Sequence, residues 1–233
     1  MKTLRRLILA FAILYAVFLI APALSSQQFA PYSLLKNGDI LDLLTPLVLL
    51  PVYWLMLEYG GAGDATARER FVFVILAAAW AMGQGMHLGA NAVGHLLDAF
   101  QATDAYALNH FLDEDLSHYI WHAASIGLMV LLLARQSRAP FADERSSFVM
   151  EGIAAVLYGL TYFIVTIEAG TLPLGLPFAL ALVAFGLMRR AQLRQKPLAA
   201  FFVFSMLLAL ILFAGWGLYW RGFPEFSRVG IIK

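Results

Sequence analysis

The sequence contains no cysteine, which excludes disulfide bonds, iron–sulfur clusters and thiolate metal ligands. Any metal site in this chain must therefore use histidine, aspartate, glutamate or asparagine. Charged residues are also scarce, at 13% of 233 residues, and the formal net charge is +1. Lysine and arginine are dispersed among short segments and form no basic stripe, so we expect no nucleic-acid partner.

Long segments of the sequence are apolar and carry few charged residues. Hydrophobic residues make up 61% of the chain, which is typical of a protein whose solvent is lipid. About 20 apolar residues span the hydrocarbon core as a helix, and seven segments approach this length: 6–25, 40–58, 71–97, 116–134, 148–168, 172–188 and 198–219. We therefore predict an all-α fold, a polytopic membrane helical bundle of about seven transmembrane helices, with a single domain over residues 1–233. We expect an integral, multi-pass protein of a bacterial inner membrane.

Lysines and arginines are distributed unequally between the two ends of these segments. One side receives twelve of them: Lys2, Arg5, Arg6, Arg68, Arg70, Arg135, Arg138, Arg145, Arg189, Arg190, Arg194 and Lys196. The other side receives four: Lys36, Arg221, Arg228 and Lys233. Because positive residues accumulate in cytoplasmic loops, we predict a cytoplasmic amino terminus and a carboxyl terminus on the far side.

The first segment has two interpretations. Arg5 and Arg6 precede an apolar run that ends near Ala21-Pro22-Ala23, as in a secretory signal peptide. The run is slightly longer than is usual for such a peptide, so we predict that residues 1–25 are an uncleaved signal anchor. Cleavage would leave six helices and would not change the interpretation of the rest of the chain.

All five histidines lie between positions 87 and 122. Imidazole groups inside a membrane usually face a bundle interior or a wet cavity. On the segment 71–97, helical spacing places His87, Asn91 and Asp98 on one stripe, with His95 to its side.

The next predicted helix carries Glu114, His118 and His122 at spacings of four, again on one face. Two imidazoles at i and i+4 can hold one metal ion. The two helices run in opposite directions, so we expect their histidines to meet at similar depth near the outer surface. The pattern predicts a metal site formed by His87, His118 and His122.

Three neutral imidazoles and a water form the usual catalytic zinc site, and zinc lowers the pKa of its bound water to near 7. Asp98 could orient that water or accept its proton. Possible additional metal partners are His95, Asn91, Glu114, Glu168 and Asp42.

Two neighbouring features have simpler interpretations. His110, beside Asn109 in an expected loop, is interpreted as a polar anchor at the membrane surface. The acidic residues Asp104, Asp113, Glu114 and Asp115 are interpreted mainly as the acidic complement of positive-inside sorting, with metal capture as the less favoured alternative.

The stretch His118-Tyr119-Ile120-Trp121-His122 resembles the closing motif of the alkaline ceramidases and, more loosely, of the adiponectin-receptor-like proteins. Both belong to the CREST superfamily of seven-helix membrane hydrolases. The resemblance implies zinc held by His87, His118 and His122, with Asp98, eleven residues after His87, assisting a water that attacks a lipid amide.

The sequence departs from that family at two points. Gly83 stands where the family has a serine four residues before the first histidine, so the hydroxyl thought to help stabilise the oxyanion is missing unless Gln84 or Asn91 replaces it. The paired histidines also lie on the fourth predicted helix, whereas in the family they lie on the seventh.

Three functions therefore remain open. The leading hypothesis is a zinc-dependent membrane hydrolase that cleaves an amide or ester bond of a lipid substrate. The second is a redox or electron-transfer membrane protein that binds haem, copper or iron through the same histidines. The third is a metal carrier, or a metal-binding accessory subunit of a larger membrane complex.

Overall fold

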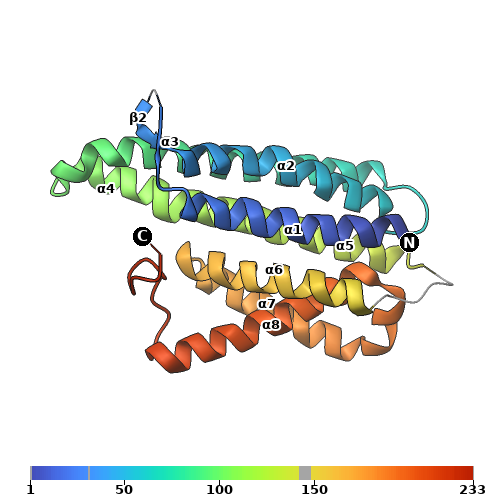
Figure 1. The fold of residues 1–233 in the computed structure, drawn as a ribbon. Helices are drawn as coiled ribbons and strands as arrows, with labels where there is room; N and C mark the ends of the chain where they lie inside the picture. Colours follow the sequence, from blue (N-terminus) through green and yellow to red (C-terminus); the bar gives the residue numbers. More distant parts are fainter. Residues whose placement is uncertain (1, 31, 142–147, 233) are drawn as a thin grey trace.

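The computed structural model describes residues 2–30, 32–141 and 148–232 (Figure 1). Its helices are α1 Lys2–Leu24, α2 Asn37–Tyr59, α3 Ala67–Leu97, α4 Asp104–His110, α5 His118–Arg138, α6 Phe148–Glu168, α7 Leu172–Met188 and α8 Pro197–Trp220. Shorter elements are the strands β1 Gln28–Phe29 and β2 Tyr32–Lys36, the 3₁₀ turns η1 Asp98–Phe100 and η3 Arg190–Gln195, and the π-helix η2 Phe111–Ser117. The two strands pair as a small antiparallel hairpin, and the rest of the described chain is predominantly helical, as predicted.

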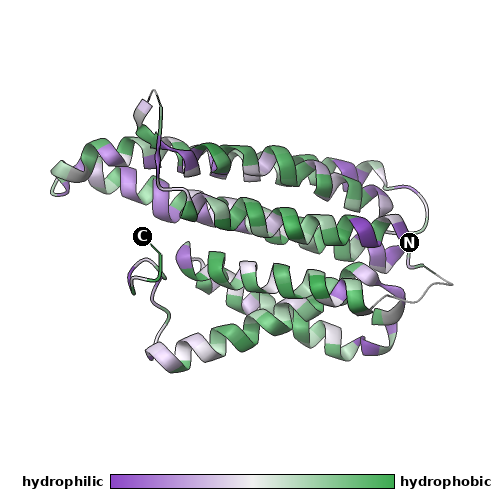
Figure 2. Cartoon of the chain, in the orientation of Figure 1, coloured by the Kyte–Doolittle hydropathy of each residue, from purple (hydrophilic) through white to green (hydrophobic). Residues whose placement is uncertain are grey.

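Six helical segments are long and apolar enough to cross a membrane. They are α1, α2, α3, the continuous segment Asp104–Arg138 formed by α4, η2 and α5, the segment Val149–Glu168 of α6, and α8. The remaining helix, α7, is also apolar but has only 17 residues. Figure 2 shows hydrophobic colouring along the shafts of the helices and hydrophilic colouring towards their ends, which is the distribution expected in a bilayer.

The helices run lengthwise in two groups (Figure 1). One group contains α1, α2, α3 and α5, and the other contains α6, α7 and α8; α1 contacts α6, while α5 contacts α7 and α8. The two chain termini lie at opposite ends of the bundle. Helices α1, α3 and α8 begin at the end where α2, α5 and α7 finish, so the predicted cytoplasmic lysines and arginines in these helices gather there. Arg145 falls in 142–147, outside the described residues.

Aromatic side chains fill the centre of the bundle. The ring centroids of Phe11 on α1 and Tyr53 on α2 are 4.5 Å apart, and those of Tyr15 and Tyr158, on α1 and α6, are 4.4 Å apart. Phe201 of α8 packs against Tyr158 at 5.3 Å. All five side chains are buried, so they join the two groups of helices through apolar contacts.

Buried polar side chains secure the end of the bundle where α5 finishes. Gln136 donates from Nε2 to the carbonyl of Gly60 at 3.3 Å and accepts at Oε1 from the backbone N–H of Ala199 at 3.1 Å. Arg135, also fully buried, donates to the carbonyl of Gly63. One turn of α5 therefore satisfies backbone groups at the end of α2, at the start of α8 and in the loop before α3.

The structure corrects one expectation that affects the site. A loop was expected from Asp104 to Asp113, before the fourth predicted helix, but this stretch forms α4 and the first part of the π-helix η2, which continues directly into α5. His110 accordingly lies on a helix, where its ring stacks against Tyr106 with centroids 6.1 Å apart. This continuous helix brings the acidic residues of the segment alongside α3.

Candidate metal site

His87 on α3 lies between two carboxylates. Its Nδ1 atom is 2.7 Å from Oδ1 of Asp113 on η2, and its Nε2 atom is 3.7 Å from Oδ2 of Asp42 on α2. Although His87 Nδ1 and Asp113 Oδ1 are close, their alignment is not that of a hydrogen bond, and neither atom has another hydrogen-bond partner among the described residues. The predicted residues His87 and Asp42 are therefore neighbours, and Asp113 joins them.

A chain of hydrogen bonds positions Asp42 from the other side. Trp80 donates from Nε1 to Oε1 of Gln84 at 3.1 Å, and Gln84 donates from Nε2 to Oδ1 of Asp42 at 2.5 Å. Two turns further along α3 from Gln84, Asn91 donates to Oδ1 of Asp39 at 3.0 Å. The amides of Gln84 and Asn91 thus hold the start of α2 against α3, and the role of Asn91 in this structure is to bind a carboxylate.

His118, the first residue of α5, faces His87. The two ring centroids are 4.8 Å apart and the ring planes are inclined by 42°. Oε2 of Glu114 is 3.9 Å from Nδ1 of His118. The structure therefore brings together two of the three predicted histidine ligands, with Glu114 at the edge of the pair.

His122 lies one helical turn deeper and is held by a different partner. Its Nδ1 atom is 2.6 Å from the hydroxyl of Thr171, the residue that precedes α7, and its ring packs against Trp121 with centroids 3.8 Å apart. Nε2 is buried without a hydrogen-bond partner among the described residues. His122 is thus oriented by the loop between α6 and α7.

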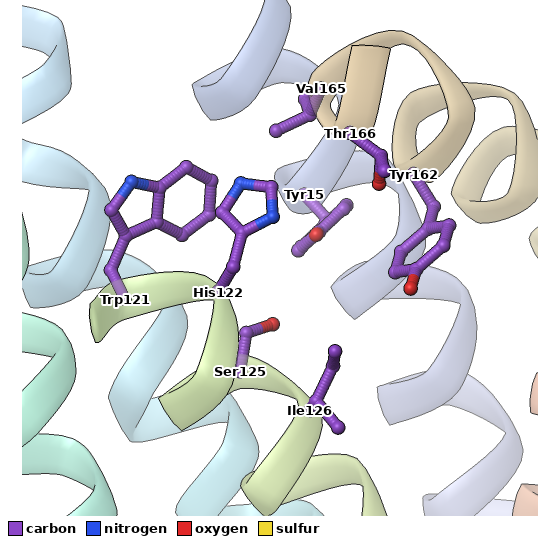
Figure 3. A pocket seen from close by; sticks show the side chains of 8 residues that line it. All are labelled: Tyr15, Trp121, His122, Ser125, Ile126, Tyr162, Val165 and Thr166. Atoms are coloured by element: carbon purple, nitrogen blue, oxygen red, sulfur yellow. The ribbon is translucent and has the colours of Figure 1, made fainter. Parts of the chain in front are cut away.

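A small cavity borders His122. Its volume is about 10 Å³, which is close to the minimum needed for one water molecule. Figure 3 shows the ring of His122 beside Ser125 of the same helix, with Tyr162 and Thr166 on the opposite helix. The hydroxyl of Thr166 also lacks a hydrogen-bond partner among the described residues. The cavity therefore has polar groups that a water molecule can bridge.

The π-helix η2 is the reason that Asp113 and His118 both contact His87. In an α-helix, two residues five positions apart are separated by about 140° around the axis. A π-helix forms i→i+5 hydrogen bonds, which bring residues five apart close to the same face. Asp113 was not predicted as a partner of His87 because it was assigned to an acidic loop, although Asp113, Ser117 and Trp121, at spacings of four, mark the buried stripe.

Gly83 allows α3 and α5 to approach closely at this level. A Cβ atom at Gly83 would lie 2.9 Å from both the carbonyl oxygen of Ser117 and the backbone nitrogen of Trp121. These are backbone atoms of the π-helix and α5, so they cannot move aside by a side-chain rotation. The missing serine is therefore accounted for by packing, because any side chain at this position would push the two helices apart.

A shared pattern emerges from the three histidines. Each has a side-chain oxygen near one ring nitrogen: Oδ2 of Asp42 is 3.7 Å from Nε2 of His87, Oε2 of Glu114 is 3.9 Å from Nδ1 of His118, and the hydroxyl of Thr171 is 2.6 Å from Nδ1 of His122. Each also has one buried nitrogen without a hydrogen-bond partner among the described residues: Nδ1 of His87, Nδ1 of His118 and Nε2 of His122. Within residues 2–30, 32–141 and 148–232, however, no three His, Asp or Glu side chains are grouped closely enough to hold a metal ion as they stand.

The other predicted residues lie further out. His95 is partly buried, with Nε2 unpaired among the described residues. Asp98 begins η1, and its side chain lies outside the described part of the chain; eleven residues of helix place its backbone about 16 Å from that of His87. Glu168 accepts hydrogen bonds from the backbone N–H groups of Phe226 and Ser227 at 2.7 and 3.3 Å, so it anchors the carboxyl-terminal segment.

Comparison with models of known families, with curated proteins and with solved structures gives no significant match. The resemblance to the CREST superfamily consequently stays a prediction, and the chemistry of the site has to be argued from its own residues.

Proposed function

We propose that this protein is a zinc-dependent integral membrane hydrolase that cleaves an amide or ester bond of a lipid. The observation that carries the proposal is the set of three histidines on α3 and α5, each with one buried nitrogen atom that makes no hydrogen bond within the described residues. The other nitrogen of His122 contacts the hydroxyl of Thr171, as in histidines that bind metal ions, whose second nitrogen usually bonds to an oxygen that fixes the tautomer. Leaving Nε2 of His122 buried without any partner would be costly.

The ring separation favours zinc over haem. Two imidazoles bound to one tetrahedral zinc, with zinc–nitrogen distances of about 2.0–2.1 Å, have ring centroids roughly 5 Å apart. Two imidazoles on opposite sides of a haem iron, with iron–nitrogen distances of about 2 Å, have ring centroids more than about 6 Å apart. The distance between His87 and His118 is 4.8 Å. With no cysteine, a set of histidines and a carboxylate is typical of a catalytic zinc site.

The proposal includes a rearrangement. His122 lies one turn of helix from His118, and its Nε2 atom must turn towards the other two rings to complete a three-histidine set. Asp113 must also move, because its carboxylate is 2.7 Å from His87 Nδ1 and so occupies the position that a metal ion bound to this nitrogen would take.

Asp113 takes the proton-handling role in this proposal. Zinc bound here would supply a water molecule that ionises near neutral pH. Asp113 is the carboxylate nearest to His87 and is buried, so it is positioned to accept a proton from that water. Asp98, which the family resemblance implies for this role, lies at the far end of α3 and remains the alternative.

The lipid substrate is inferred from the position of the site. The histidines lie within helices that are long and apolar enough to span a bilayer, so a hydrolase at this position would act on a membrane lipid. The His118-to-His122 motif adds the resemblance to ceramidases. We further propose a seven-helix topology in a bacterial cell membrane with the amino terminus in the cytoplasm, which is supported by the gathering of lysines and arginines at one end of the bundle.

The proposal is tested by measuring metal content and turnover on the same preparations. Purified wild-type protein should contain about one zinc per chain and release fatty acid from an amide- or ester-linked lipid in detergent. His118→Ala should lose both zinc and turnover. Asp113→Asn should retain zinc, while its turnover falls by about 10²–10⁴-fold, the usual contribution of general acid–base catalysis.

Two variants serve as controls. His110→Ala removes an exposed imidazole that stacks on Tyr106 outside the site and should change neither quantity. Asp98→Asn should keep full turnover; a selective loss in this variant would transfer the proton-handling role to Asp98. An undiminished zinc content in His118→Ala would refute the site. A haem absorption band in the wild-type protein, or a stoichiometric content of copper or iron, would favour the redox alternative. Stoichiometric zinc without hydrolysis of any lipid would favour a carrier or accessory subunit.

A further inference from the structure

A second cavity lies far from the histidines, between the last turns of α7 and the second and third turns of α8. Its volume is about 240 Å³. The lining is almost entirely apolar: Val183, Leu187, Leu193, Val203, Phe204 and Leu207. Leu187, Phe204 and Leu207 are exposed, so the cavity is a groove that opens on the lipid-facing surface of the bundle.

One cation lies among these apolar side chains. Arg190, the first residue of η3, lines the groove and is exposed. Arg189 precedes it, and Lys196 follows at the start of α8. Arginine at the end of α7 is favourable for the helix dipole, but that effect does not require an apolar groove beside it.

The positive charge at this corner is not neutralised by protein groups that the structure describes. None of the ion pairs between described residues involves Arg189, Arg190 or Lys196. Burial and the positive charge of Arg189 lower the pKa of Lys196 below its ordinary value, and its ammonium group donates to the neutral side chain of Gln192 at 2.9 Å. An anion at this position would therefore be bound favourably.

We propose that the groove between α7 and α8 binds an anionic phospholipid of the surrounding membrane, with an acyl chain along the apolar lining and the phosphate at Arg190. A groove on a lipid-facing surface is filled by lipid tails, since water is excluded from the hydrocarbon region. Basic pockets between transmembrane helices near the membrane surface bind anionic lipid headgroups. Arginine suits phosphate because its planar guanidinium forms paired hydrogen bonds. This site is independent of the proposed hydrolase activity.

The experiment compares two lipids on the full-length protein. Native mass spectrometry of protein from nanodiscs or mild detergent measures the binding of phosphatidylglycerol and phosphatidylcholine with identical acyl chains. Wild-type protein should bind phosphatidylglycerol at least fivefold more tightly. Arg190→Gln should remove about fivefold of that preference, the equivalent of about 1 kcal/mol for one basic side chain at the membrane surface, and should leave phosphatidylcholine binding unchanged.

Matched variants separate the groove from general charge. Arg68→Gln removes the same charge from an exposed position on α3 at the same end of the bundle and should leave the preference intact. Leu207→Trp fills the groove and should weaken binding of both lipids, whereas Leu218→Trp, on the exposed opposite end of α8, should not. Equal effects of Arg68→Gln and Arg190→Gln, or unchanged binding in Leu207→Trp, would overturn the proposal. Displacement of the lipid by inorganic phosphate alone at similar concentration would also overturn it, by showing that no acyl chain is recognised.

Discussion

Replacing Gly83 by alanine is expected to force α3 and α5 apart and to weaken metal binding. The new Cβ atom would lie 2.9 Å from two backbone atoms of the partner helix, whereas comfortable carbon contacts are about 3.5–4.0 Å. The helices must therefore separate locally by about 0.5 Å or more. Gly83 is one turn from His87, so the shift also increases the distances from His87 to Asp113 and His118.

The size of the effect can be isolated with a matched glycine on the same helix. Gly85 has no atom within 4 Å of the position that a Cβ would occupy. Both substitutions gain a similar helix propensity, about 0.8–1 kcal/mol, but only Gly83→Ala incurs the overpacking cost of about 1–3 kcal/mol. Gly83→Ala should therefore be less stable than Gly85→Ala by about 1–3 kcal/mol.

The assay is unfolding in mixed micelles, followed by circular dichroism, with zinc affinity measured in parallel by competition with a chelator. Metal ligands need placement to about 0.5 Å, so we expect the zinc affinity of Gly83→Ala to fall at least tenfold while that of Gly85→Ala is unchanged. A serine at position 83 carries the same Cβ, so Gly83→Ser should also lose affinity and gain no turnover. Equal stability and equal zinc affinity in the two alanine variants would refute the reasoning.

Three further predictions concern other contacts. Thr171→Val removes the hydroxyl that orients His122. The zinc affinity, measured by competition with a chelator, should fall by about 10–100-fold. An unchanged affinity would mean that His122 is not a ligand. Gln136→Leu leaves buried backbone groups at the end of α2 and the start of α8 without partners, and it should lower the free energy of unfolding by about 1–3 kcal/mol. Unfolding in mixed micelles should show a lower midpoint for this variant, and an unchanged midpoint would contradict the stabilising role of Gln136. Reporter fusions at Gly60 and Asp104 should report cytoplasm and the opposite side respectively, and cytoplasmic signal at Asp104 would reverse the predicted topology.

The helical fold was predictable because its cause is local. Apolar runs without charge can satisfy their backbone groups in a membrane only as helices or in a closed barrel, and each of the seven predicted segments coincides with a helical segment. The fourth segment begins earlier than predicted, because the polar residues between Asp104 and Asp113 suggested a loop. They form a helix because their polar side chains pack against α3 or face outward, which a hydropathy pattern does not encode.

The candidate site was predictable only in part. The proximity of His87 and His118 follows from two antiparallel neighbouring helices and was anticipated from their spacing. The pairing of His87 with Asp113 depends on i→i+5 hydrogen bonding in η2, which no composition signal marks. The contact between His122 and Thr171 joins residues that are far apart in the sequence, so it requires the packing of α7 against α5.

The π-helix η2 also makes the site sensitive to insertion. One surplus residue in this stretch widens the turn and aligns Asp113 with His118. Removal of a single residue such as Asp115 would restore ordinary α-helical winding and leave Asp113 four positions before His118, about 40° away around the axis, so both would still face α3. Insertion of one further residue would instead place Asp113 six positions before His118, about 120° away in an α-helix. An insertion of one codon would therefore disconnect the carboxylate from the imidazoles in a bundle that keeps its membrane-spanning segments. Among relatives of this chain, the length of this segment would then distinguish proteins with the carboxylate in place from those without it.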